Sequence, residues 1–308
     1  MAPAQKTADS RGARSLAALA MLGWLGVTGG CTGMVQGPTT PAELAVALRH
    51  EVPAAPDTLL AKFDRTVFYS DDGRHAMVPR QRLEKWARPI KVVIVGSLSQ
   101  AHREFVEVHF AELSLLTGLP ITLQGGRGSI REAVTSLDRR EANFVVAIDS
   151  RGRLDRLQAA LGASDGERWT NSRVVCFFYA SPRRGRIVEA FAAIPNMHRE
   201  ALLRHCIVEE TTQALGLFAD ADMIQPSMFS ERTPPILGQL TLNDKIIVRT
   251  LYDPRITPNM PREEALAVAR GVIAELIDGV RHEGAEALYQ RPAAPTLEAM
   301  GPGAASGS

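Results

Sequence analysis

The residues best suited to chemistry lie in the segment 204–220, which reads RHCIVEETTQALGLFAD. Side chains four residues apart share one face of a helix, so His205, Glu209 and Gln213 are expected to form a polar column with Glu210 beside it. A solvated helix face, or a buried polar column bonded to its surroundings, would explain this pattern structurally. The functional hypothesis is an active-site helix in which Glu210 acts as a general base.

The same segment has the spacing of a metallopeptidase zinc helix without its histidines. Zincin helices read H-E-x-x-H-x-x-G, because two histidines four residues apart bind zinc and the glutamate polarises the metal-bound water. In this register the chain has Glu209, Glu210, Gln213 and Gly216. The glutamate and the glycine are kept, whereas both histidine positions hold residues that bind zinc less well. The resemblance implies a zincin-like scaffold with a degenerate site.

The available donor atoms limit the metals that such a site can bind. Zinc prefers thiolate and imidazole, and a neutral amide is a poor donor, so tight zinc binding is not expected. The oxygens of Glu209, Glu210 and Gln213, with Asp220 or Asp222, suit a harder, weakly held divalent ion such as calcium or magnesium, and Glu209, Gln213 and Asp220 are the expected ligands. No cofactor is firmly implied. Without an ion, the adjacent glutamates need basic partners, such as Arg204, or raised pKa values.

A second segment, LYDPRITPNM, adds two candidate residues. Met260 is a candidate for the methionine turn that lies beneath the metal in zincins, and Tyr252 for a phenol near it. Packing at a helix end explains both residues equally well, so both interpretations stay open.

The N-terminal residues have the features of an export signal. Three basic residues precede an apolar run over 16–27 and the small residues TGG before Cys31. The run is too short to span a bilayer, which needs ~20 apolar residues. The small residues before Cys31 resemble a lipoprotein cleavage box, although Thr28 stands where such boxes have leucine. We therefore expect a lipid anchor on Cys31 in the cell envelope, facing the periplasm; cleavage near Gly29 and a soluble periplasmic protein are the alternative.

The remaining cysteines fit an oxidising compartment. With Cys31 assigned to lipid, Cys176 and Cys206 are left as a pair. A disulfide between them would stabilise the fold by roughly 3 to 4 kcal/mol on the loop-entropy model. Two buried reduced thiols are the alternative.

Hydrophobic periodicity predicts an α+β fold in which a twisted mixed sheet is backed by helices and a long central helix carries the degenerate motif. Expected strands are 90–96, PITLQGG, NFVVAID, SRVVCFFYA and GRIVEAFAAIP, the last two forming a hairpin. Expected helices are 100–118, DRLQAALG, 197–215, 241–251 and 261–281. We expect Asn196 to cap the helix over 197–215 and Gly216 to end it.

The expected organisation has four parts. They are a signal peptide over 1–31, a tether and wrapping segment over 32–85, a zincin-like domain over 86–285 and a disordered tail over 286–308. The blocks HCIVEETTQALGLFAD, QPSMF and LTLNDKIIVRTLYDPRITPNM, in this order, resemble the domain of unknown function family 2927, a family of proteobacterial lipoproteins. The resemblance covers roughly 88–276 and implies a cell-envelope setting, without an activity.

Two functions are compatible with these features. The leading hypothesis is a non-catalytic envelope protein that uses the old cleft to bind a peptide, a protein or cell-wall material. The alternative is an unconventional hydrolase with Glu210 as base and an ion on Glu209, Gln213 and Asp220. Because the formal net charge is +1 and no long basic cluster occurs, no nucleic-acid partner is expected, and membrane contact would be through lipid alone.

Overall fold

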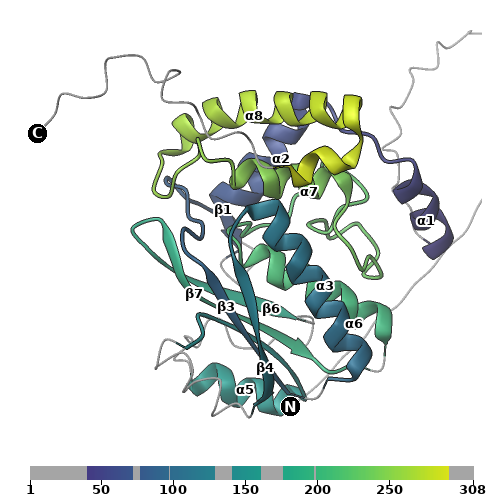
Figure 1. The fold of residues 1–308 in the computed structure, drawn as a ribbon, viewed down its shortest axis with the longest axis vertical. Coiled ribbons are helices and arrows are strands. Elements are labelled where there is room, and N and C mark those ends of the chain that lie inside the picture. The colour runs from purple at the N-terminus through teal and green to yellow at the C-terminus, as the bar shows by residue number, and fades with distance from the viewer. Residues whose placement is uncertain are drawn as a thin grey trace, which may run out of the picture. The chain divides into compact units, whose positions relative to one another are not determined.

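The computed structural model describes residues 40–71, 77–96, 98–128, 141–160, 176–197 and 199–290. Within them the chain has an α+β fold built on a five-stranded mixed sheet that helices cover (Figure 1), which confirms the predicted class. The predicted signal peptide with Cys31 lies outside the described residues, as do residues 291–308 of the predicted tail. In the part of the chain that is described, no helix has the length and apolar character needed to cross a membrane.

The five strands have the order β4-β3-β5-β7-β6. Their bounds are β3 (Ile90–Gly96), β4 (Ile121–Gly128), β5 (Phe144–Asp149), β6 (Phe177–Arg183) and β7 (Arg186–Pro195). Strands β4, β3, β5 and β7 run parallel, and β6 pairs antiparallel with β7 at one edge. The predicted hairpin turns at Arg184 and Gly185, both with positive φ. All five predicted strands are therefore present.

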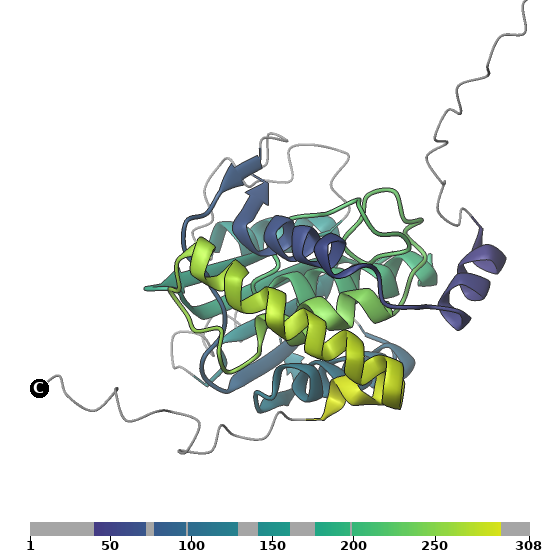
Figure 2. The same ribbon diagram turned by 90° about the horizontal axis from the view of Figure 1, so that it is seen from above.

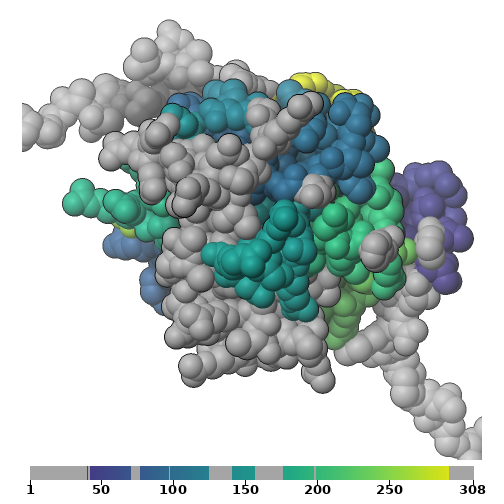
Figure 3. Space-filling model, turned by 90° about the horizontal axis from the view of Figure 1, so that it is seen from below, coloured from purple at the N-terminus to yellow at the C-terminus, as the bar shows by residue number. Residues whose placement is uncertain are grey.

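Both faces of the sheet are buried, which explains why its strands read as continuous apolar runs. Val92 and Ile94 point into the large core, which includes residues of α3 (Gln100–Thr117) and α6 (Glu200–Gln213). The alternate residues Val93 and Val95 point to a smaller apolar cluster on the other face. That cluster contains the buried Leu154 of α5 (Arg151–Ala160). Helix α5 itself lies at the surface and is seen in teal in the view from below (Figure 3).

A second layer of helices lies beyond α3 and α6. It consists of α2 (Pro56–Phe68), α7 (Leu242–Leu251) and α8 (Arg262–Glu283), and Figure 2 shows α2 and α8 side by side. We expected residues 56–68 to wrap around the domain, and this is corrected: α2 is a core helix, with Leu59, Phe63 and Val67 fully buried. Lys62 and Thr66 share the buried face, and these polar residues obscured the helical period.

The other corrections concern element ends. Arg199 rather than Asn196 occupies the N-cap position of α6, without a capping side-chain hydrogen bond, because the Asn196 amide bonds to the Asp149 carbonyl and continues the sheet ladder. A 3-10 helix, η2 (Ala285–Tyr289), buries Leu288 where we expected the disordered tail to begin. The smaller elements are α1 (Pro41–Arg49) and a two-stranded sheet of β1 (Tyr69–Asp71) and β2 (Met77–Pro79).

Candidate functional site

The C-terminal end of α6 is held by side chains from distant segments. The Trp86 Nε1–H donates to the Ala214 carbonyl at 3.0 Å, and the Tyr252 hydroxyl donates to the Leu215 carbonyl at 2.7 Å. These bonds satisfy carbonyls that a helix end leaves without partners. Gly216 follows with φ +118°, and a Cβ there would lie 2.4 Å from the Glu84 carbonyl oxygen. Glycine at this position is therefore a requirement of packing.

The middle of α6 is tied to the sheet and to α3. The predicted disulfide between Cys176 and Cys206 is confirmed and joins α6 to the residue before β6. On another face of α6, His109 lies 3.0 Å from the Thr211 hydroxyl, whose own proton is donated to the Ile207 carbonyl. Burial lowers the pKa of His109 to about 4, so a neutral imidazole donates to Thr211. These contacts fix the rotation of α6 about its axis.

With α6 fixed in this way, the carboxyls of Glu209 and Glu210 are brought together. Oxygens of both lie within 4.8 Å of each other and of the Cys176 sulfur, which is part of the disulfide. The Glu210 residue is only 5% exposed. We call Glu209, Glu210 and the nearby Asp220 the carboxylate cluster, because the charges of these three groups act on one another.

Burial raises the pKa values of both glutamates in the carboxylate cluster, and the charges of their acidic neighbours raise them further. Burial, followed by the charges of Asp220 and Glu231, raises the pKa of Glu209 to about 8. Burial, followed by the charges of Glu209 and Asp220, raises the pKa of Glu210 well above its ordinary value. Adjacent glutamates without an ion were expected to have either basic partners or raised pKa values. The structure favours the raised pKa values. Burial and the neighbouring charges therefore favour the protonated form of the Glu210 carboxyl.

The other members of the predicted column adjoin this cluster. The Nδ1–H of His205 donates to the Leu237 carbonyl at 3.0 Å, which leaves Nε2 directed at Glu209, 3.4 Å from its Oε2. Burial lowers the pKa of His205, so its ring is neutral and Nε2 carries a lone pair. The Gln213 amide donates to Asp220 Oδ1 at 2.8 Å. Gln213 and Asp220 are thus bonded to each other.

Other predicted residues have structural contacts. The Tyr252 hydroxyl accepts a hydrogen bond from the Trp86 amide besides donating to Leu215, and burial raises its pKa. The Met260 carbonyl accepts from the Leu83 amide. Arg204, considered as a partner for the glutamates, pairs with Glu200 instead.

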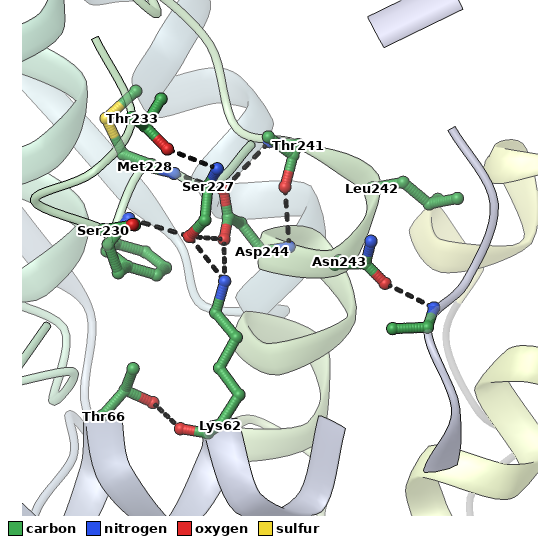
Figure 4. A network of polar contacts seen from close by, with 12 residues as sticks. Lys62, Thr66, Ser227, Met228, Ser230, Thr233, Thr241, Leu242, Asn243 and Asp244 are labelled. Carbon is green, nitrogen blue, oxygen red and sulfur yellow. Dashed lines mark hydrogen bonds and ion pairs between the residues drawn. The ribbon is translucent and has the colours of Figure 1, made fainter. Parts of the chain in front are cut away.

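A buried polar network that the sequence analysis missed holds the loop carrying Asp220 (Figure 4). The Lys62 Nζ donates to Asp244 Oδ1 at 2.7 Å and to the Ser227 hydroxyl at 2.5 Å, and all three side chains are fully buried. Asp244 also accepts from the Ser227 hydroxyl and the Met228 amide, both at 2.7 Å.

This network stabilises the charged form of Asp244 and acts structurally. Burial alone would raise the pKa of Asp244, but the charge of Lys62 and the hydrogen bonds keep it below its ordinary value. Close to the network, the Ala219 amide donates to the Thr66 carbonyl, so the start of the loop also rests on α2. The sequence signalled only the Thr241 cap of α7 in this network. It did not reveal the ion pair, because a lysine within a helix does not indicate a partner so far along the chain.

A comparison with known families identifies the region that contains these elements. The family model described as "Protein of unknown function (DUF2927)" matches residues 56–271. The chain belongs to this family. No curated protein matches the chain.

The DUF2927 match covers the elements that build the site. It begins at the first residue of α2 and ends within α8, so it includes both Lys62 and Asp244. Residues 56–85, which we had assigned to a tether and wrapping segment, therefore belong to the DUF2927 region. They supply Lys62, the residue that balances the charge of Asp244.

Proposed function

We propose that this DUF2927 protein is an exported cell-envelope protein, anchored through lipid on Cys31, whose carboxylate cluster binds a ligand without catalysing its hydrolysis. The leader over 1–31 supports export and the lipid anchor. The mixed sheet, with an antiparallel edge strand beside the helix that carries the degenerate motif, supports a zincin-like scaffold. In the mature protein the cluster would face the periplasm.

The observation that carries this proposal is the environment of Glu210. A general base has to be deprotonated and within reach of the water that it activates. The Glu210 residue is 5% exposed, and burial and the charges of Glu209 and Asp220 raise the pKa of its carboxyl well above the ordinary value, which favours the protonated acid. A protonated acid cannot take the proton of an attacking water. The residue in the base position therefore serves binding better than catalysis.

The donors at the two histidine positions point the same way. Glu209 supplies a carboxyl, and the Gln213 amide donates to Asp220. Neither residue supplies the imidazole that zinc prefers, so these residues do not fit a zinc ion. A buried set of carboxyls favours a positively charged ligand, because a cation would neutralise charges that the cluster now suppresses by protonation. The partner is an envelope peptide, a protein or a cell-wall fragment.

One observation favours an unconventional metal-assisted hydrolase as a second candidate. The imidazole of His205 has its tautomer fixed by the Leu237 carbonyl and directs Nε2 at Glu209. Metal-ligating histidines commonly donate their other ring N–H to a carbonyl in this way. In this candidate function Glu210 would be the base.

Hydrolysis assays separate the two candidates. Mature wild-type protein and Glu210→Gln would be incubated with peptide and cell-wall fragments, and cleavage products would be quantified. For a binding module we expect no turnover by either protein. Loss of a general base typically lowers rates 10²-fold or more. Hydrolysis by the wild type that disappears in Glu210→Gln, with an unchanged melting temperature, would contradict the proposal. Glu264→Gln, an exposed position on α8, removes the same charge as a control.

A further inference from the structure

We infer that Glu209 and Glu210 together form a site for one divalent cation that prefers oxygen ligands, such as Ca²⁺, Mg²⁺ or Mn²⁺. The inference rests on the proposed use of the carboxylate cluster for binding and names the ligand class. The pair narrows the set of oxygens considered from the sequence, because Gln213 and Asp220 are bonded to each other.

The separation of the carboxyls suits a single ion. Their oxygens lie within 4.8 Å of each other. Ca²⁺ binds oxygens at about 2.3–2.6 Å and Mg²⁺ at about 2.0–2.1 Å, so two ligands of one ion are at most about 5 Å apart. One ion between Glu209 and Glu210 can therefore contact both carboxyls with small side-chain adjustments.

An independent observation is that the side chain of the buried residue Glu210 has no partner among the described residues. Although this residue is only 5% exposed, its carboxyl has no hydrogen bond or ion pair with any residue in the described ranges. Burying a polar group without a partner is costly, and native structures seldom do so. The Glu210 carboxyl therefore lies in the cluster without a hydrogen bond from the cluster's own residues.

Two other buried carboxylates in the same domain, Asp244 and Asp253, are paired, unlike Glu210. Asp244 is bonded to Lys62, Ser227 and backbone amides. Asp253, 4% exposed, is bonded to Arg255. At these two positions the fold supplies a cation, whereas Glu210 has no such partner among the residues that the structure describes.

The surrounding charges and donor atoms define the class of ion. The charges that act on both Glu209 and Glu210 come from acidic neighbours, including Asp220. Two carboxylates match the charge of one divalent ion. The Cys176 sulfur is oxidised in the disulfide and offers no thiolate, so the donors are oxygens with the His205 Nε2 close to Glu209. Such a set suits hard cations better than zinc.

Titration calorimetry on the mature, chelator-treated wild-type chain tests the inference, with CaCl₂, MgCl₂, MnCl₂ and ZnCl₂ as separate titrants. We expect saturable binding of one ion per chain for at least one of the first three salts. At about one hundred times Kd, that salt should raise the melting temperature by several degrees. Glu210→Gln and Glu209→Gln should each weaken binding at least tenfold, whereas Glu264→Gln should bind like the wild type.

Several results would overturn the cation site. These are no binding of the three hard cations, binding of zinc alone, or unchanged affinity in both glutamine variants. Circular dichroism would show that each variant is folded, and two single variants guard against a defect in one of them. The hydrolysis assay is separate: a chain that binds no ion and hydrolyses nothing loses this inference but keeps the proposed binding function.

Discussion

Replacing Glu209 with glutamine should stabilise the protein against unfolding near pH 8 and leave its stability unchanged near pH 4. In the folded chain burial and the charges of Asp220 and Glu231 raise the pKa of Glu209 from 4.5 to about 8. A raised pKa means that the folded state binds the proton more tightly than the unfolded state. The stability contributed by the protonated Glu209 is therefore fully present below about pH 4.5 and is lost as the pH rises towards about 8.

The size of the effect follows from that shift. Each pH unit in this window costs up to about 1.4 kcal/mol of the free energy of unfolding, so the loss approaches about 4 kcal/mol near pH 8. Because Glu209 shares its protons with the neighbouring Glu210, we expect the measured difference between variant and wild type to be roughly 2–4 kcal/mol. Glutamine keeps the shape of the side chain and has no charge to lose.

Urea unfolding with a chelator present, followed by circular dichroism from about pH 4 to pH 8, measures this difference. The wild type should lose stability with rising pH more steeply than Glu209→Gln, while the exposed Glu264→Gln should follow the wild type. A difference between Glu209→Gln and the wild type that does not depend on pH would refute the electrostatic reasoning. So would a variant that is less stable than the wild type near pH 8.

Three further predictions concern the anchor, the packing and the scaffold. Cys31→Ser should move the protein from the membrane to the soluble fraction without unfolding it; unchanged fractionation would reject the lipid anchor. Gly216→Ala should destabilise the chain by roughly 3 kcal/mol or more in urea unfolding, because it strains a positive φ and places a Cβ against the Glu84 carbonyl. Wild-type stability would disprove the packing argument. The double variant Glu209→His/Gln213→His should gain zinc affinity in calorimetry; a folded double variant without zinc uptake would argue against a zincin-like cleft.

Local patterns predicted the sheet and the disulfide well, because strands buried on both faces read as apolar runs and the two cysteines were the natural remaining pair. The same patterns missed α2, since Lys62 interrupts the apolar period of its buried face. Its burial is explained only by Asp244, which lies far along the chain and had no local signal.

Helical spacing likewise grouped His205, Glu209 and Gln213 correctly on one side of a helix. It could not show that Gln213 bonds to Asp220, because that contact depends on the path of the following loop. Nor could it show that the Tyr252 hydroxyl binds the Leu215 carbonyl. Such pairings are decided by tertiary packing, which overrides what neighbouring residues favour.

The buried pair of Lys62 and Asp244 also constrains how the sequence can change over evolutionary time. Losing one partner of a buried ion pair typically costs about 3–5 kcal/mol, while native proteins have only about 5–15 kcal/mol of stability in total. Replacing both partners by apolar residues of similar volume is often nearly neutral. Single substitutions at either position would thus be purged before the second could arise. Across the DUF2927 family these two positions, 182 residues apart, should therefore vary together or not at all.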